Sequence, residues 1–104
     1  MNVASGSGVK VLFIEDNPIH VGLVKTLLGE SRAPIFQLQH AGSLQDGLKL
    51  LEAVPVDIIL LDLTLPDSED LDTFIRVRSF APAIPIVIVT SLDDVKLAAK
   101  AVEA

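Results

Sequence analysis

The segment that decides the fold is VDIILLD, residues 56–62, an aliphatic run that ends on an acid. Two runs of the same kind lie on either side of it in the chain, VKVLFI at residues 9–14 and IPIVIV at residues 84–89. Short β-branched runs without polar alternation are typical of strands that helices cover on both faces of a parallel sheet. A fourth run, IFQLQH at residues 35–40, alternates apolar and polar side chains, which predicts an edge strand.

Helical patterns fill the intervals between these runs. Asn17 followed by Pro18 is a typical helix start, and Ser43 begins a second helix with the pattern of a capping box. A third helix is predicted from Ser68 and a fourth from Ser91. The first helix is expected to present one apolar face, formed by Ile19, Leu23, Leu27 and Leu28. The third helix is supported by the helical spacing of Leu71, Phe74, Ile75 and Arg78. The order βαβαβαβα predicts a parallel α/β sheet with right-handed crossovers.

Length and composition narrow the class of protein. The 104 residues suit one small domain, and a hydrophobic content of 50% is too high for intrinsic disorder. The absence of cysteine excludes disulfides and thiolate chemistry. Fourteen acids against eight basic residues give a net charge of −6, which argues against nucleic-acid binding by this chain. With no membrane-length apolar run and no export signal, we expect a soluble cytoplasmic protein with a flexible segment at residues 1–8.

Acidic and hydroxyl side chains follow three of the predicted strands at their carboxyl ends. Glu15 and Asp16 follow the first, Asp62 the third and Thr90 the fourth. Ligands bind beyond this edge in open α/β sheets, and neighbouring strands are roughly 4.8 Å apart, so we expect these groups within about 10 Å. Three carboxylates repel one another there unless a cation joins them, and Mg²⁺ prefers oxygen ligands such as these and the Thr64 carbonyl. The sequence therefore predicts a magnesium site.

Each of these residues also has a structural interpretation. Asp16 can cap the first helix, and Thr90 can cap the fourth. Asp62 is harder to explain in this way, because an unpaired carboxylate at the end of the most apolar strand is unfavourable. The two histidines, His20 and His40, have no partner at metal-ligand spacing and are expected to be surface or partly buried. No phosphate-binding loop of the pattern G-x-x-x-x-G-K-[ST] occurs.

Three stretches together resemble the receiver domain of bacterial two-component response regulators. They are VLFIEDNPIHVGLVKTLL at residues 11–28, DIILLDLTLPD at residues 57–67 and IPIVIVTS at residues 84–91. The resemblance extends from Val9 to Ala104. It implies a flavodoxin-like (CheY-like), doubly wound parallel sheet of order 2-1-3-4, the family's fifth strand and fifth helix being absent from this chain.

The resemblance also implies a role for each residue at the strand ends. Asp62 is the expected phosphoacceptor for a histidine kinase or phosphotransfer protein. Asp16 and Asp62 are expected to ligate Mg²⁺ by carboxylate, Thr64 by its backbone carbonyl and Glu15 through water. The Thr90 hydroxyl is expected to bond the phosphoryl oxygen and to move with it as the switch. The implied function is a phosphorylation-dependent signalling switch, not an enzyme.

Two departures from the family pattern modify these expectations. Asp70 stands where the family usually has glycine, and the family's phosphoryl-pairing lysine belongs to the fifth strand. We therefore expect residues 9–104 to form an incomplete receiver domain that binds Mg²⁺ weakly and is phosphorylated poorly. We also expect a homodimer through the exposed fourth strand, Ile86 to Val89.

Two alternative functions remain open from the sequence. One is a pseudo-receiver, an interaction module that binds partners without phosphotransfer. The other is a Mg²⁺-dependent phosphatase that uses Asp62 as a transient nucleophile. The phosphatase is the weaker alternative, because Thr64 stands where haloacid-dehalogenase-type phosphatases carry a second aspartate.

Overall fold

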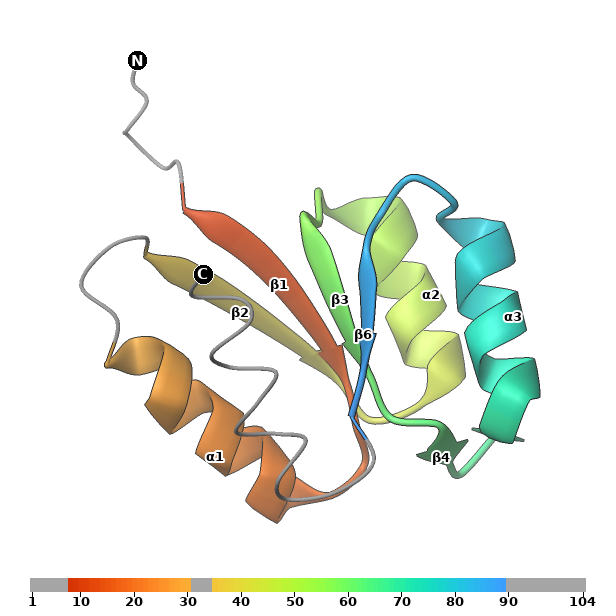
Figure 1. Ribbon diagram of the computed structural model, residues 1–104, viewed down its shortest axis with the longest axis horizontal. Coiled ribbons are helices and arrows are strands. Elements are labelled where there is room, and N and C mark those ends of the chain that lie inside the picture. The colour runs from red at the N-terminus through yellow and green to blue at the C-terminus, as the bar shows by residue number, and fades with distance from the viewer. Residues whose placement is uncertain (1–7, 31–34, 90–104) are drawn as a thin grey trace.

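A four-stranded parallel sheet forms the centre of the structure, a computed structural model that describes residues 8–30 and 35–89 (Figure 1). Its strands are β1 (Val9–Ile14), β2 (Phe36–Ala41), β3 (Ile58–Leu61) and β6 (Ile86–Ile88). Their spatial order is β2-β1-β3-β6, and each neighbouring pair is parallel. Since β6 is the fourth strand that the sequence predicts, this order confirms the doubly wound 2-1-3-4 arrangement.

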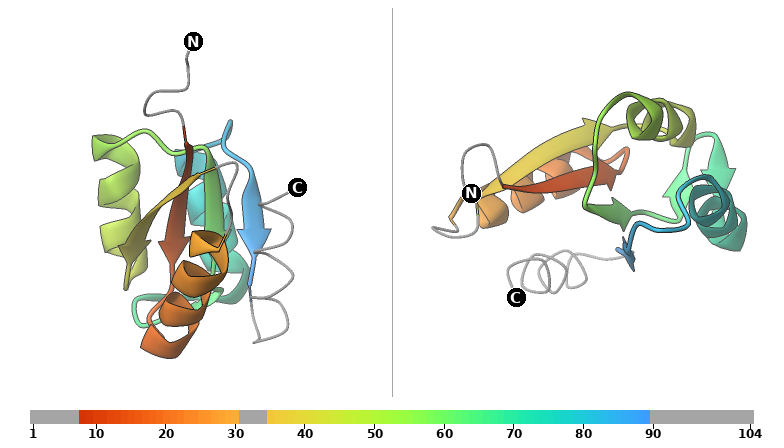
Figure 2. Two further views of the ribbon diagram at one scale, coloured as in Figure 1. Left: turned by 90° about the vertical axis from the view of Figure 1, so that its left-hand side faces the viewer. Right: turned by 90° about the horizontal axis from the view of Figure 1, so that it is seen from above.

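Helices cover both faces of this sheet (Figure 2). Helix α1 (Pro18–Gly29) lies on one face, and α2 (Leu44–Ala53) and α3 (Asp70–Phe80) lie on the other. Alternate strand residues therefore enter two separate cores. The core under α1 includes Val11, Phe13, Leu60, Val24 and Leu28, and the core under α2 and α3 includes Leu12, Ile14, Ile59, Leu61, Leu44 and Val77. Burial on both sides explains why β1 and β3 lack polar alternation.

The predicted buried face of α1 is wrong at Ile19, whose side chain is 73% exposed. The buried positions of this helix are Val21, Val24 and Leu28. Most residues from Ile19 to Leu28 are apolar, so more than one stripe at helical spacing runs along the helix. Contact with the sheet, which periodicity does not reveal, decides which stripe is buried.

A short antiparallel hairpin between β3 and α3 was not predicted. It consists of β4 (Thr64–Leu65) and β5 (Ser68–Glu69), joined by a turn at Pro66 and Asp67. Because β5 pairs back on β4, helix α3 starts at Asp70 and not at Ser68. The Pro-Asp pair is a typical turn signal, so the sequence carried an indication of this hairpin.

Helix α3 also buries a face other than its most apolar one. Leu71 and Ile75 are 65% and 50% exposed, whereas Thr73 and Val77 are completely buried. The Thr73 hydroxyl donates to Ser68 Oγ at 2.8 Å, so this polar group is satisfied inside the core. A hydrogen-bonded threonine thus occupies a core position that a hydrophobic pattern assigns to leucine or isoleucine.

β1 and β2 have the length of the runs that predict them, whereas β3 and β6 are shorter than theirs. β3 and β6 both start two residues after the beginning of their apolar runs. In β6 the later start coincides with Pro85, which has no amide hydrogen to donate. The Pro85 carbonyl still accepts a hydrogen bond from the Ile59 amide at 2.9 Å. The helix predicted from Ser91 and most of the segment 1–8 lie outside the described residues. Within the described ranges, no helix is both long and apolar enough to cross a membrane.

Candidate functional site

The candidate site lies where β1 and β3 end side by side. Ile14 and Leu61 are partners in the parallel register, which brings the next residues, Glu15 and Asp62, together at the carboxyl edge. The Asp62 amide donates to the Ile14 carbonyl at 3.0 Å, and the Glu15 amide donates to the Ala41 carbonyl at 2.9 Å. The sheet's hydrogen-bond ladder therefore continues to these two acids and fixes their backbone.

Three carboxylates converge at this edge. One oxygen each of Glu15, Asp16 and Asp62 lies within 4.8 Å of the other two. Glu15 is 1% exposed, Asp62 is partly buried and Asp16 is exposed. The structure thus brings together the three acids that the sequence singled out, in surroundings that grade from the core to solvent.

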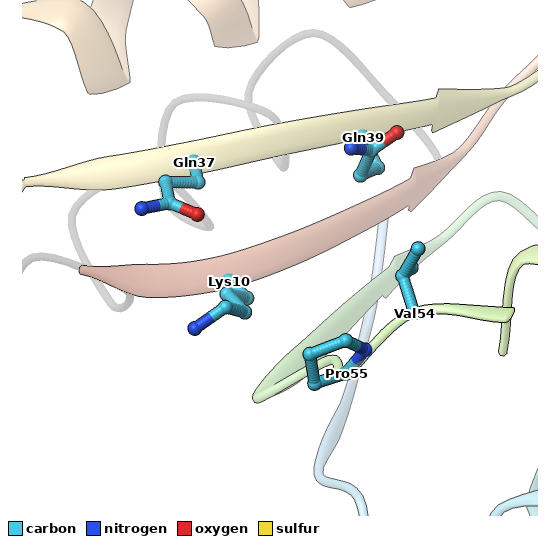
Figure 3. A pocket seen from close by; sticks show the side chains of 5 residues that line it. All are labelled: Lys10, Gln37, Gln39, Val54 and Pro55. Atoms are coloured by element: carbon cyan, nitrogen blue, oxygen red, sulfur yellow. The ribbon is translucent and has the colours of Figure 1, made fainter. Parts of the chain in front are cut away.

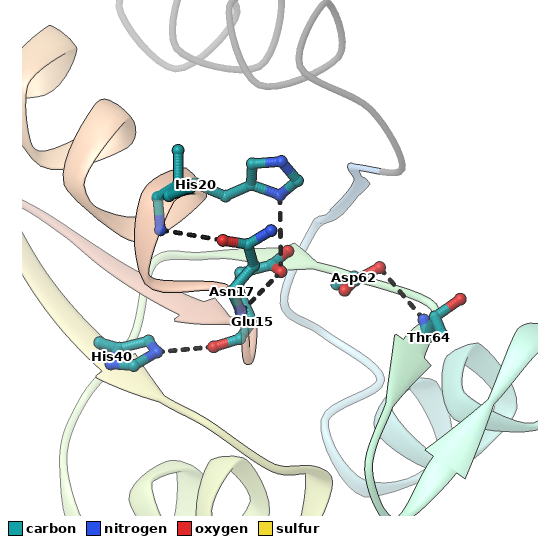
Figure 4. A network of polar contacts seen from close by, with 7 residues as sticks. Glu15, Asn17, His20, His40, Asp62 and Thr64 are labelled. Carbon is teal, nitrogen blue, oxygen red and sulfur yellow. Dashed lines mark hydrogen bonds and ion pairs between the residues drawn. The ribbon is translucent and has the colours of Figure 1, made fainter.

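Glu15 is the most constrained of the three acids (Figure 4). Its Oε1 accepts from the Asn17 amide at 3.0 Å and lies 3.5 Å from His20 Nδ1, whereas Oε2 is buried without a hydrogen-bond partner among the described residues. Burial raises the pKa of Glu15 to about 7; the Asn17 amide and His20 oppose this shift, and the charge of Asp62 adds to it. A negative charge on Glu15 is therefore unfavourable unless a cation joins the cluster.

Asp62 is held by the chain that follows it. The Thr64 amide donates to Asp62 Oδ1 at 3.1 Å (Figure 4), so the first residue of β4 fixes the orientation of the carboxylate. The carbonyl of Thr64 as a metal ligand stays a prediction. Thr90, the expected switch residue, lies outside the described residues.

Both histidines contact Glu15, which sequence spacing did not indicate. His20 approaches its carboxylate from the first turn of α1, and His40 Nε2 at the end of β2 donates to its carbonyl oxygen at 2.7 Å. Neither joins the carboxylate cluster as a further ligand among the described residues. The expectation that both are at the surface or partly buried is confirmed, since His20 is partly buried and His40 is exposed, and their contacts with Glu15 are an additional finding.

Asp67, in the turn of the hairpin, is a further acid near this edge. Its two oxygens accept from the Leu44 amide at 2.8 Å and the Gln45 amide at 2.9 Å, at the start of α2. Burial opposes ionisation here, but these hydrogen bonds outweigh it and lower the pKa of Asp67 below its ordinary value. The partners are more than twenty residues away in the chain, so no local pattern indicates this contact.

Asp70 begins α3 in the left-handed region, with a φ of 54°. Its amide donates to the Leu63 carbonyl at 2.6 Å, which closes the loop after Asp62. Few residues other than glycine adopt this conformation readily, although aspartate tolerates it better than most. The left-handed backbone thus gives a geometric reason for the expectation of glycine at this position, and this chain keeps the geometry with an aspartate.

The pocket shown in Figure 3 is elsewhere in the molecule. It has a volume of about 220 Å³ and is lined by Lys10, Gln37, Gln39, Val54 and Pro55. Lys10 is the second residue of β1, whereas Glu15 follows the last, so the pocket is displaced toward the amino end of the sheet. Glu15, Asp16 and Asp62 do not line this pocket. The candidate site is therefore the acidic edge of the sheet and not this cavity.

Comparison with known proteins gives consistent matches. The probable transcriptional regulatory protein TcrX of Mycobacterium tuberculosis is 29% identical over 96 residues, which are 92% of this chain and 40% of TcrX. A protein-glutamate methylesterase/protein-glutamine glutaminase of Paramagnetospirillum magneticum is 32% identical over 90 residues, 86% of this chain and 25% of that protein. The chain thus spans less than half the length of these curated relatives.

A solved structure and a family model complete the comparison. The crystal structure of a CheY-like response regulator receiver domain protein from Methanospirillum hungatei superposes with a TM-score of 0.71 at 22% identity, covering 89% of this chain and 76% of that one. At this identity the likeness shows the fold. The family model for the response regulator receiver domain matches residues 11–104, nearly the whole chain. The chain therefore belongs to the response regulator receiver domain family.

Proposed function

We propose that this chain is a phosphorylation-dependent switch of a two-component system, in which Asp62 accepts a phosphoryl group from a histidine kinase or phosphotransfer protein. The observation that carries the proposal is the convergence of Glu15, Asp16 and Asp62 within 4.8 Å at the end of the sheet. Membership of the receiver domain family supports the signalling role. We further propose that the domain works in the cytoplasm as a signalling module without catalytic turnover of its own.

Burial and position favour Asp62 as the phosphoacceptor among the three acids. Glu15 is almost inaccessible to an incoming phosphoryl donor, and its pKa of about 7 leaves part of it protonated at neutral pH. Asp16 is exposed at the start of the loop before α1. Asp62 is accessible from solvent, yet its backbone is fixed by Ile14 and its Oδ1 by the Thr64 amide. A held but accessible carboxylate is what attack on an incoming phosphoryl group requires.

The cluster fits a divalent cation with oxygen ligands. The unpartnered Oε2 of Glu15 and the repulsion between Glu15 and Asp62 would both be relieved by a positive charge. We propose that Asp16, Asp62 and the Thr64 carbonyl hold Mg²⁺ directly and that Glu15 holds it through water. When bound, Mg²⁺ neutralises charge that develops on the transferring phosphoryl group.

In the proposed reaction an Asp62 oxygen forms a bond to phosphorus. The phosphorus–nitrogen bond of the donor phosphohistidine breaks, and the donor nitrogen keeps the electron pair. The hydrogen bond from the Thr64 amide to Oδ1 holds the attacking carboxylate in place for this step. The Thr90 hydroxyl is proposed to donate a hydrogen bond to a phosphoryl oxygen and to move with it. This movement is proposed to change the surface that a partner protein binds.

We also propose that two copies associate through β6. Within the described part of the chain β6 pairs with β3 alone, and Ile88 at its end is 41% exposed. An open strand edge with an apolar side chain is a template for pairing with a second copy. Light scattering after size exclusion should give the mass of a dimer at micromolar concentration. A monomer mass at every concentration contradicts this part of the proposal.

Phosphorylation by acetyl phosphate with Mg²⁺ tests the switch. We expect intact-mass spectrometry to detect a phosphorylated chain that hydroxylamine reverses, since an aspartyl phosphate is an acyl phosphate. Asp62→Asn should eliminate the modification. The matched control is Asp57→Asn, which changes an exposed acid at the other end of the same run and should leave labelling intact. Undiminished labelling of Asp62→Asn overturns the assignment, and unlabelled wild-type chain that still binds Mg²⁺ favours the pseudo-receiver.

A further inference from the structure

The β4–β5 hairpin is attached to helices on both of its sides. On one side, both carboxylate oxygens of Asp67 accept from backbone amides of α2, Leu44 at 2.8 Å and Gln45 at 2.9 Å. On the other side, the buried Thr73 hydroxyl of α3 donates to Ser68 Oγ at 2.8 Å. The hairpin is therefore held between α2 and α3; Asp67 supplies both hydrogen bonds to the start of α2, and Leu65 of β4 shares a core cluster with Leu44.

The contact of Asp67 with α2 is of a strong kind. Amides at the start of a helix have no partners within the helix, and a carboxylate there also interacts favourably with the helix dipole. Ser43 Oγ accepts from the Asp46 amide at 3.1 Å, so Asp67 and Ser43 satisfy different amides of the same helix end. Arg76 on α3 adds a positive charge that favours the ionised form of Asp67.

The attached hairpin includes the backbone next to the site. The hairpin starts at Thr64, two residues after Asp62, and the Thr64 amide donates to Asp62 Oδ1 at 3.1 Å. Thr64 and Leu65 pair with β5 across the turn that contains Asp67. A shift of the turn relative to α2 therefore displaces the segment that orients Asp62.

We propose that Asp67 is a positioning residue for the metal site: by tying the hairpin to the start of α2, it holds Thr64 against Asp62 and strengthens the binding of Mg²⁺. The inference rests on the proposed function and adds to it a residue that touches neither the metal nor the phosphoryl group. Groups that hold metal ligands in place commonly change metal affinity by roughly 10- to 100-fold when removed.

The test compares Asp67→Ala and Asp67→Asn with Ser43→Ala in the full 104-residue chain. Ser43→Ala is the matched control, because it removes a cap from the same helix end without touching the hairpin. Calorimetric titration with Mg²⁺, well below each melting temperature, gives the dissociation constants. We expect about tenfold weaker binding for Asp67→Ala, a smaller loss for Asp67→Asn, and less than about a twofold change for Ser43→Ala.

The amide resonance of Thr64 in a ¹H–¹⁵N spectrum gives a second readout. It should move in both Asp67 variants and stay in place in Ser43→Ala. Equal Mg²⁺ affinity for wild type and the Asp67 variants overturns the positioning role and leaves the proposed function standing. Equal weakening in Ser43→Ala also overturns it, because helix stability then accounts for the effect. A wild-type chain that binds no Mg²⁺ overturns the metal site itself and this inference with it.

Discussion

Glu15, after β1, and Asp67, in the hairpin turn, are both acids close to the carboxyl edge of the sheet, but their oxygens have different partners. Both oxygens of Asp67 accept from amides at the start of α2, and its pKa is lowered. Glu15 is buried, one of its oxygens has no partner among the described residues, and its pKa rises to about 7. The folded state therefore stabilises the ionised carboxylate of Asp67 and destabilises that of Glu15.

The difference separates an acid whose charge the fold stabilises from an acid whose charge the fold disfavours and that we propose is kept for a cation. Asp67 gains from the fold, because helix amides and the dipole favour its charge. The Glu15–Asp62 pair loses, because burial and mutual repulsion are relieved only when a cation binds. The strained carboxylates thus mark the functional cluster, and the satisfied carboxylate marks part of its support.

The largest expected effect is the dependence of stability on pH set by Glu15. Its pKa is about 7 when folded and near its ordinary 4.5 when unfolded, so protonation favours the folded state. Without metal, the free energy of unfolding should fall by up to about 3 kcal/mol as the pH rises from about 5 to 8. Urea unfolding in chelator, followed by circular dichroism because tryptophan and tyrosine are absent, measures it. Glu15→Gln should flatten this dependence, and an unchanged slope contradicts the assignment.

The next effect concerns Gly47, which sets how closely α2 approaches the end of β1. A Cβ at this position would lie 2.6 Å from Ile14 Cδ1, whereas a Cβ at Gly22 in α1 would meet nothing within 4 Å. Gly47→Ala should lower the free energy of unfolding by about 1–3 kcal/mol through overpacking. Gly22→Ala is the matched control and should raise it by up to about 1 kcal/mol through helix propensity. Stabilisation by both substitutions would show that Ile14 moves aside freely.

A smaller effect is expected at Asp70, which begins α3 with a positive φ. Asp70→Gly relieves backbone strain and should raise the free energy of unfolding by about 0.5–1 kcal/mol. Asp70→Ala keeps the strain and loses the tolerance of aspartate for this region, so it should be destabilising. Thermal melts of the two variants distinguish these signs. A glycine variant that is less stable than the alanine variant contradicts the role of backbone conformation.

The smallest effect is on the acid side, where exposed Asp67 titrates. The pKa of Asp67 is lowered from the ordinary value of 3.8. The contribution of Asp67 to the free energy of unfolding is therefore complete above pH 3.8 and is lost as the pH falls through the pKa that Asp67 has in the folded state. Wild type should therefore be more stable than Asp67→Asn near neutral pH, and the gap should narrow toward about pH 3. Unfolding curves of both chains at several acidic pH values measure it. A gap that widens on acidification contradicts the lowered pKa.

The sequence by itself determined the four strands of the parallel sheet and the acids at their ends. Uninterrupted aliphatic runs such as Ile58–Leu61 are stable only when both faces are buried, which requires helices on both sides of a parallel sheet. Acids directly after such runs must then gather at one edge, and Glu15, Asp16 and Asp62 do so. Local signals were also sufficient at the starts of α1 and α2, since the side chains of Asn17 and Ser43 both accept the expected capping hydrogen bonds.

Only the tertiary structure decided which helix faces are buried and which acid supports which helix. Ile19 and Val21 are both apolar residues of α1, and contact with the sheet buries the second and exposes the first. Asp67 completes a helix start that lies more than twenty residues earlier in the chain, a contact without local signature. The raised pKa of Glu15 likewise depends on burial and on Asp62, neither of which is adjacent in sequence. Periodicity and capping are local, whereas desolvation and contacts between distant segments exist only once the chain has folded.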